Sequence, residues 1–550
     1  MKQIVALLVA ATILAGAAFA TGQSETGGGA EQPTVMTIAY ESEPGNLNTI
    51  IWPTTSDTNV THMVYDSLVV PSKELEMVGR LAESWTVSDD NRTYTFKLRE
   101  GVTWHDGEPF TAADVEFTFR MMAHPDYDMG SNSRVQGIVG AAEYRAGEAD
   151  SVAGIQVIDD YTISFTTIEP YAPFLSDLFI GVLPEHIWSG MNPTDWAQNE
   201  ANRAPIGTGP FKFVRWEGGQ FIEFAANEDY FGTVPEVDQL YFRFGDQNAL
   251  LAAFLSGEID VVPVPAAELE TIDSSPAGEL MLGDQLTFYY IGFNVRNEHF
   301  SDPAIRIAMA HAVDKRQIVD TVLGRLGAVQ HDIFPNSHWS HNPETPQFAY
   351  DQDLAHELIE DAGYSMGADG FYRKGGETLG LTLEVPTGNK EREQTAVLLK
   401  QFWEEVGIST ELRYQDFPTL VTKLLPRTND GRQREVTADD YDAYILGFGI
   451  EADPNEYYTY FHSQTMPPNG YNFVGYSDPE MDDLFDRQLT VTNFDERQQI
   501  FWQISEHLVS RQVWLPLYYQ KESYAVSDRV RNFEVDFRGL TFEAETWSVE

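Results

Sequence analysis

The stretch LREGVTWHDGEPFTAADV (Leu98–Val115) places one histidine, two aspartates and two glutamates within a few residues of one another. Imidazole and carboxyl groups are the side chains that most often transfer protons in enzymes. An acid–base centre would be built from a group of this kind. Whether the chain catalyses a reaction therefore depends on what else these residues do.

Most of the acids in this stretch have structural roles that their neighbours predict. Glu100-Gly101 and Asp106-Gly107 are turn dipeptides beside short strands. Thr111 and Asp114 fit a helix capping box, in which the threonine accepts from a backbone N–H and the aspartate reaches back to the cap. Only His105 lacks such a role, and a lone histidine beside a turn is usually structural. We therefore predict no catalytic centre here.

Metal and cofactor chemistry find little support in the sequence. With no cysteine, the chain has no thiolate ligand, disulfide or cysteine nucleophile. The H-E-x-x-H and G-x-x-x-x-G-K-[ST] motifs are missing, and Gly207-Thr208-Gly209 lacks the third glycine of a dinucleotide site, so it is interpreted as a packing turn. His331, His338 and His341 are a weak metal alternative in a polar loop. We predict no metal and no cofactor; a secreted hydrolase with paired carboxylates stays open as an alternative of another class.

The N-terminus reads as an export signal. Lys2 precedes an apolar run, and Ala18-Phe19-Ala20 is a small-x-small cleavage site, so residues 1–20 are predicted to be a signal peptide. The run is shorter than the roughly 20 residues that span a bilayer. Residues 21–33 are rich in glycine, serine and threonine and are expected to form a flexible leader. Because no cysteine follows the signal, we expect a protein free in the periplasm and without a lipid anchor.

The negative charge of the chain argues against polyanionic partners. A formal net charge of −50, from 85 acidic and 35 basic residues, repels nucleic acid and anionic lipid, which both require basic patches. The acids are spread along the chain, and aromatic residues make up 13% of it, which indicates a folded protein. A chain of 550 residues exceeds what one core usually serves, so two or more lobes are expected. We expect a monomer.

The elements that must position any site change along the chain. Tyr94, Phe96 and Leu98 alternate as in a half-buried strand, and residues 155–165 read as a hairpin. After residue 300, helices alternate with strands: a helix capped by Ser301, a helix over 391–407 closed by glycine, and strands over 409–414 and 441–449. The alternation predicts an α/β, doubly wound lobe with largely parallel strands after a more β-rich first half.

Five segments in one order carry a resemblance to a known family. The segment Leu81–Arg120 is similar to the signature of the family 5 extracellular solute-binding proteins, which feed peptide and nickel ABC importers. Four further matches lie at residues 204–232, 288–319, 441–463 and 475–489. The resemblance implies the two-lobed periplasmic-binding-protein fold (type II, cluster C), with an extra subdomain in lobe one and a hinge of two crossovers. It implies a receptor without enzymatic activity.

The family's architecture places the lobes on this sequence. Lobe one is expected at residues 34–288 plus 519–550, with the extra subdomain at about 54–168, and lobe two at 289–518. The chain would cross between lobes near 288–294 and near 517–519, which makes a hinge around which the lobes close on a ligand. The implied partners are a captured solute and a membrane ABC permease with its separate ATPase.

The site residues follow from the same resemblance. In peptide-binding members an aspartate of this segment pairs with the peptide's α-ammonium group, and Asp453 is its positional match, with Glu451 as the fallback. The alternative is that Asp453-Pro454 is only a turn. Asn294 is expected mainly to satisfy backbone groups at the hinge. The complete set of predicted ligand-binding residues is Asp453, Glu451, Phe448, Trp52, Glu43, Trp339 and Asn294.

One departure from the family bears on the ligand. Dipeptide-binding members carry a Pro-Arg pair that clamps the ligand carboxylate, and the corresponding stretch, residues 384–394, has none. Lys390 and Arg392 are nearby, but helical spacing puts them on a solvated face. We therefore predict an oligopeptide receptor without a fixed dipeptide length. Oligosaccharides, and less strongly chelated nickel, remain the alternatives.

Overall fold

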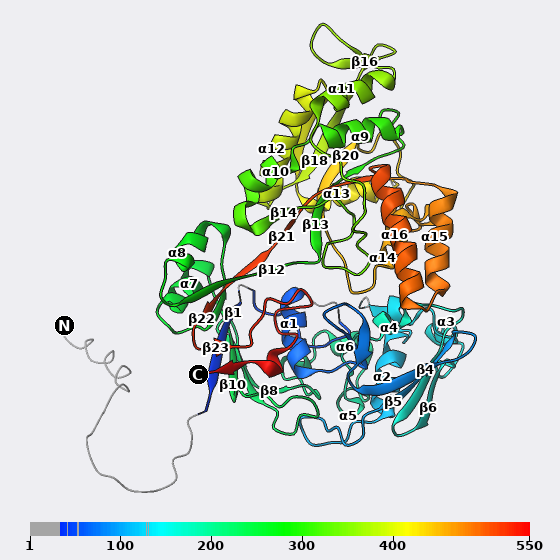
Figure 1. The fold of residues 1–550 in the computed structure, drawn as a ribbon. Coiled ribbons are helices and arrows are strands. Elements are labelled where there is room, and N and C mark those ends of the chain that lie inside the picture. Colours follow the sequence, from blue (N-terminus) through cyan, green and yellow to red (C-terminus); the bar gives the residue numbers. More distant parts are fainter. Residues whose placement is uncertain (1–32, 41, 52–53, 128, 130, 429) are drawn as a thin grey trace, which may run out of the picture. The chain divides into compact units, whose positions relative to one another are not determined.

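The computed structural model of the protein describes residues 33–550, apart from 41, 52–53, 128, 130 and 429 (Figure 1). The predicted signal peptide, nearly all of the predicted leader and the predicted site residue Trp52 lie outside the described residues. No helix within the described part of the chain combines the length and the apolar character that crossing a membrane requires.

One half of the fold is built on a seven-stranded sheet. Its order is β12-β22-β11-β1-β10-β9-β8. The strands lie before residue 284, except β22 from the C-terminal segment: β1 (Val35–Tyr40), β8 (Phe211–Glu217), β9 (Phe221–Ala226), β10 (Gln239–Phe244), β11 (Val261–Pro263), β12 (Gly278–Gly283) and β22 (Glu522–Ser527). We call the part of the chain around this sheet lobe one.

The other half, lobe two, is built on a six-stranded sheet of order β14-β21-β13-β20-β18-β19. Its strands are β13 (Thr287–Phe293), β14 (Gly327–Val329), β18 (Gly380–Pro386), β19 (Ser409–Gln415), β20 (Ala443–Gly449) and β21 (Trp514–Gln520). Only β18 pairs in parallel, with β19 and β20, and the other pairs are antiparallel. The prediction of a largely parallel sheet was therefore wrong. Helical crossovers join β18, β19 and β20, whereas β13, β14 and β21 come from distant segments and are free to run antiparallel.

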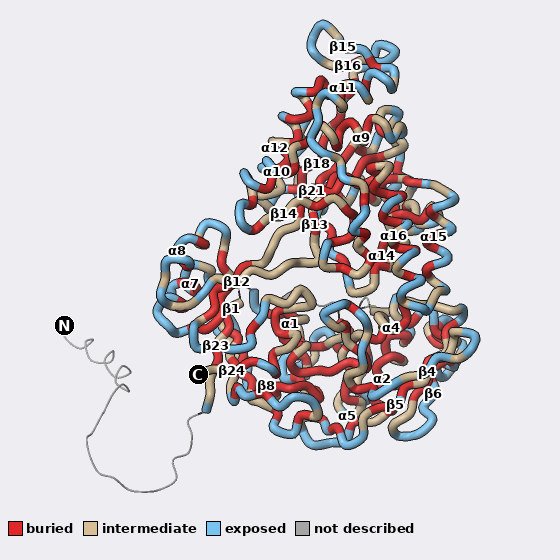
Figure 2. The backbone as a smooth tube through the Cα atoms, viewed as in Figure 1, coloured by how far each residue is buried: buried red, intermediate tan, exposed pale blue. Residues whose placement is uncertain are grey.

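The chain passes between the two sheets twice. β12 leads through Asp284–Leu286 into β13, and β21 leads through Lys521 into β22. The whole of β13 belongs to the second sheet, so the first change of sheet precedes the predicted crossover at 288–294. In Figure 1 these two segments connect the parts of the fold carrying β1 and β18. Residues 280–287 are only half-buried, which Figure 2 shows as a tan stretch between red sheets.

A smaller four-stranded sheet lies within lobe one, in order β4-β5-β7-β6. Its strands are β4 (Ala82–Val87), β5 (Thr93–Leu98), β6 (Ile155–Asp159) and β7 (Thr162–Thr166), and helix α2 (Ala112–Met122) lies between β5 and β6 in the chain. The predicted hairpin is β6–β7, and the inward residues of β5 are buried as predicted. Phe96 and Phe165 of this sheet share one core with Ile38 and Phe242 of the large sheet.

The acid-rich opening stretch is scaffold, as predicted. Thr111 and Asp114 form the capping box of α2, and Asp114 also accepts from the Glu185 N–H at 3.0 Å. His105 has a structural role as well. Its Nε2 lies 2.9 Å from the Gly209 carbonyl, and its Nδ1 accepts from the Gly207 N–H at 3.3 Å. Burial lowers the pKa of His105 to about 4, so the ring is neutral at pH 7.

His105 holds the Gly-Thr-Gly segment where only glycine fits. A Cβ on Gly207 would lie 1.8 Å from the Val64 carbonyl oxygen, and one on Gly209 would lie 2.5 Å from that of Met63. The segment packs directly against the C-terminal end of α1 (Thr55–Val64). The interpretation of this motif as a packing turn is confirmed.

The helices of the fold are mostly short in lobe one and longer in lobe two. Those of lobe one, besides α1 and α2, are α3 (Ala141–Arg145), α4 (Phe174–Asp177), α5 (Glu185–Trp188), α6 (Pro193–Trp196), α7 (Gln247–Leu255) and α8 (Leu269–Asp273). Those of lobe two are α9 (Pro303–His311), α10 (Lys315–Ile318), α11 (Gln352–Asp361), α12 (Lys390–Glu405), α13 (Phe417–Leu424), α14 (Glu456–Phe461), α15 (Pro479–Thr490) and α16 (Phe494–Ser510).

Two predicted helix ends in lobe two can be compared with the structure. The cap of α9 is Asp302, whose side chain accepts from the Ala304 N–H, and not Ser301 as predicted, because Pro303 occupies the first helical position. Helix α12 ends before Gly407, whose φ of +80° is the left-handed conformation of a glycine after a helix. That end is as predicted.

Candidate ligand-binding site

A cavity of about 350 Å³ is lined by residues of both lobes. Lobe one contributes residues of α1, of β2 (Val69–Pro71) and of the C-terminal segment, including His62, Tyr65 and Phe542. Lobe two contributes the chain just after β20, Ile450 to Ala452. A volume of this size is at the lower end of the range for small-molecule sites. We call it the first cavity.

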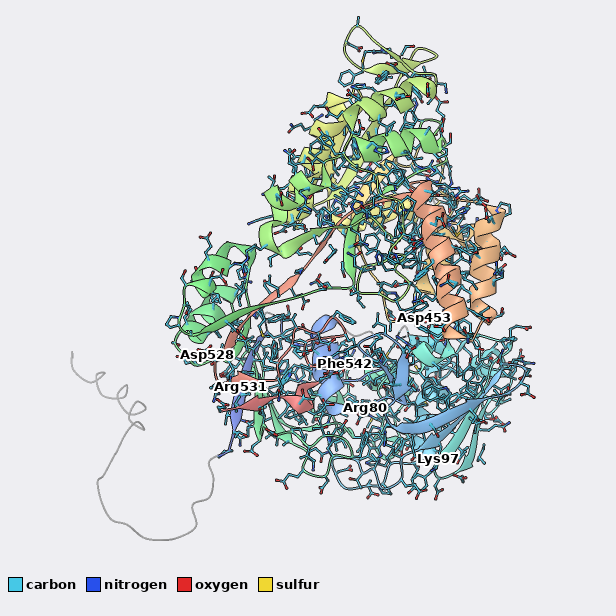
Figure 3. The ribbon with its side chains drawn as sticks, in the orientation of Figure 1. Arg80, Lys97, Asp453, Asp528, Arg531 and Phe542 are labelled. Carbon is cyan, nitrogen blue, oxygen red and sulfur yellow. The ribbon has the colours of Figure 1, made fainter. Side chains whose placement is uncertain are left out.

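The lobe-one wall of the first cavity is aromatic. The His62 ring lies 5.5 Å from that of Phe179 and 5.8 Å from that of Phe542, measured between ring centroids. Burial and the nearby Arg80 lower the pKa of His62 to about 4, so this ring is neutral as well. Figure 3 labels Arg80 and Phe542 in this wall.

Two polar atoms of this wall have no hydrogen-bond partner among the described residues. They are the Tyr65 hydroxyl and Nδ1 of His62, both shielded from solvent. Leaving a buried polar group unpaired costs about 1–3 kcal/mol. A ligand atom or a water molecule within reach would therefore be held there.

Two cations of the same wall, Arg80 and Arg538, are already neutralised. Arg80 donates to Asp66 at 2.9 Å and to Glu545 at 2.8 Å. Arg538 donates to Glu543 at 2.7 Å and forms a pair with Asp536. These arginines shape the wall without offering a free positive charge to a ligand carboxylate.

A second cavity of about 220 Å³ adjoins the first. Both are lined by Leu75, Met77, Ser176 and Ala452, so they meet along these residues. The second cavity is lined in addition by Trp339, Asp453, Phe494 and Arg497 of lobe two. A ligand longer than one residue could occupy both.

Asp453 is paired within the protein. Its two carboxylate oxygens accept from both terminal nitrogens of Arg497, at 2.5 and 2.7 Å, and one of them also accepts from the Asn455 N–H at 2.9 Å. Arg497 is held in turn by Gln488 Oε1 at 2.9 Å. A carboxylate has about four acceptor positions, so one position of Asp453 remains for a further donor. The bond to Asn455 means that the residue is also a turn residue.

The lobe-two side of the cavities carries more carboxylates than guanidinium groups. Glu451, Asp453 and Glu456 lie together on one short segment, and Asp177 of lobe one faces them. Burial and the neighbouring Glu451 raise the pKa of Glu456 to about 8, and burial raises that of Asp177 well above its usual range. The cations among them are Arg134, 3.6 Å from Glu451, and Arg497. A protonated amine would be stabilised beside this group.

Direct bonds join the lobes at the same place. The Asn455 amide donates to the Tyr171 hydroxyl at 3.2 Å, and the Ala172 N–H donates to the Leu489 carbonyl at 2.7 Å. Figure 3 shows Asp453 at the end of lobe two that faces lobe one. The acid-rich segment therefore lies where the lobes touch.

The structure brings three of the predicted ligand residues to the cavities. Asp453 and Trp339 line the second cavity, and the Trp339 ring nitrogen donates to the Ala452 carbonyl at 2.9 Å. Glu451 lines the first cavity, with 72% of its side chain exposed.

The other described residues of the predicted set have different positions. Phe448 is only 7% exposed, and its ring centroid lies 5.2 Å from that of Trp514 in the core of lobe two. Glu43 lines neither cavity, because it accepts from the Trp216 ring nitrogen at 2.6 Å beside the β8–β9 turn. Asn294 is fully buried and donates to the carbonyls of Thr437 and Tyr441. It satisfies backbone groups as expected, but at the end of β13 away from the crossover.

The cations predicted to be solvated near residue 390 are of two kinds. Lys390 is exposed, whereas Arg392 is half-buried and donates to the Pro386 carbonyl at 3.1 Å, so the prediction for Arg392 was wrong. Arg392 lies in the first turn of α12, which begins shortly after β18 ends. Its side chain therefore reaches the carbonyl of Pro386, the last residue of that strand. Glu384 is buried and paired with Arg413 and Lys423.

The histidines considered for metal binding do not form a cluster. His338 lies between the Ser340 hydroxyl and the Glu451 carbonyl, and His341 bonds to Asp332 at 2.9 Å. Among the residues described, the group with ligand atoms close enough for one ion is Glu298, His299 and Glu377, elsewhere in lobe two.

One short segment matches a sequence motif of serine hydrolases. Gly363–Gly367 matches the G-x-S-x-G motif of serine hydrolases, in which the serine stands on a turn from a strand into a helix. Here the order is reversed, since α11 precedes the motif and Ser365 begins the short strand β15 (Ser365–Met366) on the surface. The motif is a coincidence of sequence.

Sequence reasoning missed the lobe-one wall and Arg497. His62 and Tyr65 lie on a helix whose capping box, Thr54 with Asp57, was a readable signal of the helix itself. Nothing in the local sequence marks which side of that helix meets a cavity. Phe542 joins it from a segment almost 480 residues further along the chain.

Comparisons with known proteins agree with this architecture. The family described as bacterial extracellular solute-binding proteins, family 5, matches residues 76–468. The oligopeptide-binding protein AppA of Bacillus subtilis is 27% identical over 530 residues, covering 95% of this chain and 93% of AppA. The dipeptide-binding protein of Escherichia coli is 26% identical over 442 residues, 78% of each chain.

Solved structures show the same fold. AppA of Bacillus subtilis in complex with a nonapeptide superposes with a TM-score of 0.71 at 27% identity, over 94% of this chain and 100% of that one. HbpA2 of Haemophilus parasuis has a TM-score of 0.79 at 22% identity, over 94% and 100%. The two-lobed fold predicted from the sequence is confirmed.

Proposed function

The chain belongs to the bacterial extracellular solute-binding proteins of family 5, and we propose that it captures oligopeptides between its two lobes and delivers them to a membrane ABC permease. The protein binds and releases its ligand without making or breaking a bond. The ATPase that drives import is a separate polypeptide.

The observation that carries the choice of a peptide is the cluster of acidic side chains beside a cavity lined from both lobes. Glu451, Asp453, Glu456 and Asp177 stand against Arg134 and Arg497. The α-ammonium group of a peptide brings a positive charge, which favours the ionised form of acids whose pKa is raised. A neutral sugar does not.

Within this proposal Asp453 receives the α-ammonium at its remaining acceptor position. Arg497 holds the carboxylate in place from the opposite side, with two bonds and little freedom of its own. A charge-assisted hydrogen bond of this kind contributes about 1.5–3 kcal/mol. The centroid of the Trp339 ring lies 5.7 Å from Cζ of Arg497, and Trp339 adds an aromatic side chain to the lining of the second cavity.

The proposed ligand is longer than a dipeptide. Residues 384–394 offer no free guanidinium for a carboxylate, since Arg392 is engaged at the end of β18. Of the arginines of the first cavity, Arg80 and Arg538 are paired with Asp66, Asp536 and Glu543, and Arg134 lies 3.6 Å from Glu451. The ligand's carboxyl end therefore needs no fixed partner, and the two adjoining cavities accommodate an extended chain.

The proposed location is the periplasm, reached through a signal peptide over residues 1–20 that is cleaved. The proposed state is a monomer, and the net charge of −50 argues against a nucleic-acid partner.

Native mass spectrometry of the freshly purified mature protein tests the proposal. Retained ligand masses that resolve into amino-acid residues would support an oligopeptide receptor. Masses spaced by hexose or pentose units would replace the peptide with an oligosaccharide and make Trp339 and Trp52 the residues to test. A single nickel-containing mass would indicate a chelate receptor. Chemical turnover of an added candidate would indicate a hydrolase.

A further inference from the structure

Three side chains that could ligate a metal meet at the surface of lobe two. Glu298 and His299 belong to the loop between β13 and α9, and Glu377 begins the short strand β17 (Glu377–Thr378). One ligand atom of each lies within 4.8 Å of the others. They line an open depression of about 710 Å³ that shares no residue with the two ligand cavities.

The imidazole of this group is held in a fixed orientation. Nδ1 of His299 lies 2.8 Å from the hydroxyl of Tyr364, which is itself only 6% exposed. Metal-bound histidines usually engage their second nitrogen in such a bond, which sets the tautomer and the ring plane. Nε2 of His299 is then the nitrogen available to an ion, with no bond of its own among the described residues.

The loop carrying Glu298 and His299 is ordered by its own bonds. Asn297 Oδ1 accepts from the His299 N–H at 2.9 Å, and the Asn297 amide donates to Asp442 at 2.9 Å. The Ser301 hydroxyl donates to the Glu298 carbonyl at 2.9 Å. The ligand atoms are therefore brought together without help from an ion, and little ordering remains for metal binding to impose.

The charges of the depression leave the two glutamates uncompensated. The arginines lining the depression are engaged elsewhere: Arg296 donates to the Phe473 carbonyl at 2.8 Å, and Arg413 pairs with the buried Glu384. A divalent cation would supply the missing charge.

We propose that Glu298, His299 and Glu377 bind a divalent transition-metal ion of the Zn²⁺ type, with water completing the coordination. One imidazole and two carboxylates form a ligand set that Zn²⁺ accepts, whereas Ca²⁺ and Mg²⁺ prefer oxygen ligands alone. The ion joins the β13–α9 loop to β17 and stabilises lobe two. This site is independent of the peptide and of the proposed function.

The test uses the metal-stripped mature protein, titrated with Zn²⁺ against a chromophoric chelator and with Co²⁺ as a spectroscopic probe. The variants are His299→Ala and Glu377→Gln. The matched controls are His124→Ala and Glu279→Gln, which change the same residue types outside the site. We expect one equivalent whose affinity falls at least about tenfold in both variants and in neither control. Zn²⁺ should also raise the Tm of the wild type more than that of either variant.

Two further results bear on the assignment. A Co²⁺ absorption band that requires His299, and an affinity that falls in Tyr364→Phe while the ligands are intact, would support the proposed coordination. Absence of a bound equivalent in the wild type would overturn it. So would an equivalent that both variants retain, because the ion would then be held elsewhere on the acidic surface. Neither result would affect the peptide proposal.

Discussion

Two acid-rich stretches of this chain look alike in sequence and differ in what surrounds them. In residues 98–115 the acids cap a helix or close turns, and His105 is held between two backbone groups. In residues 448–456 three acids gather where the lobes meet, beside two cavities, and their proximity and burial raise the pKa of Glu456 to about 8. Completed local bonding marks the scaffold, and acids brought close together by the tertiary fold mark the site.

The largest effect that separates the two regions is expected at Glu456. Its pKa of about 8 in the folded protein exceeds the ordinary value of 4.5, so the folded state binds the proton more tightly. This contribution to stability is present below pH 4.5 and is lost as the pH rises through 8. Glu456→Gln should therefore be more stable than the wild type at pH 8 by an amount on the order of a few kcal/mol.

Urea unfolding from pH 5 to 9 measures this difference. Glu279→Gln, on an exposed strand of lobe one, is the matched control and should follow the wild-type curve. Parallel pH profiles for the wild type and Glu456→Gln would mean that Glu456 is solvated, and would contradict its burial beside the other acids.

The scaffold stretch should respond to pH in the opposite direction. His105 has a folded pKa of about 4 against an ordinary 6.5, so its contribution is present above pH 6.5 and is lost as the pH falls through 4. His105→Ala should lower the free energy of unfolding at pH 7 by about 2–3 kcal/mol, because two buried backbone groups lose a partner.

The His105→Ala variant should also lose less stability than the wild type between pH 6.5 and 4. Peptide affinity at pH 7 should not change, since His105 lines neither cavity. An affinity that fell with the substitution would place the opening stretch in the site after all.

The matched pair Asp453→Asn and Asp106→Asn sharpens the comparison on binding. Asp453→Asn removes the charge that faces the α-ammonium, and we expect peptide affinity to fall about 10- to 150-fold, or roughly 1.5–3 kcal/mol. Asp106→Asn removes the same charge from the scaffold, where Asp106 bonds to His186 at 2.8 Å, and should bind peptide like the wild type. Calorimetric titration measures both, and equal losses would erase the distinction.

The smallest effect is expected at the cap of α2. Thr111→Ala removes one cap hydrogen bond and should lower the free energy of unfolding by about 1 kcal/mol. Peptide affinity should be unchanged. Denaturant unfolding and titration together check this, and a change in affinity without a loss of stability would contradict the structural role of the stretch.

The sequence predicted the scaffold better than the site, for a physical reason. Capping boxes, turn dipeptides and alternating strands are local, so Thr111, Asp114 and Phe96 could be placed from their neighbours. The order of strands in the six-stranded sheet depends on β13, β14 and β21, which come from distant segments, and local patterns do not fix their direction.

The site depends on distant segments to an even greater degree. Asp453 was found by resemblance, but its pairing with Arg497 joins residues 44 positions apart, and no motif announces it. Phe448 lies in the core of lobe two, and an aromatic residue beside a site and one in a core have the same local pattern. His62 and Tyr65 were missed because a helix face becomes a cavity wall only when the C-terminal segment packs beside it.

The most direct test of the account compares one peptide with a free α-amino group and its N-acetylated form on the wild type and on Asp453→Asn. The account predicts that acetylation and the substitution each weaken binding about 10- to 150-fold, and that together they cost little more than either alone, because both remove the same bond. Equal affinity of the wild type for the free and acetylated peptides would contradict the central claim that this carboxylate-rich junction receives the ligand's ammonium group.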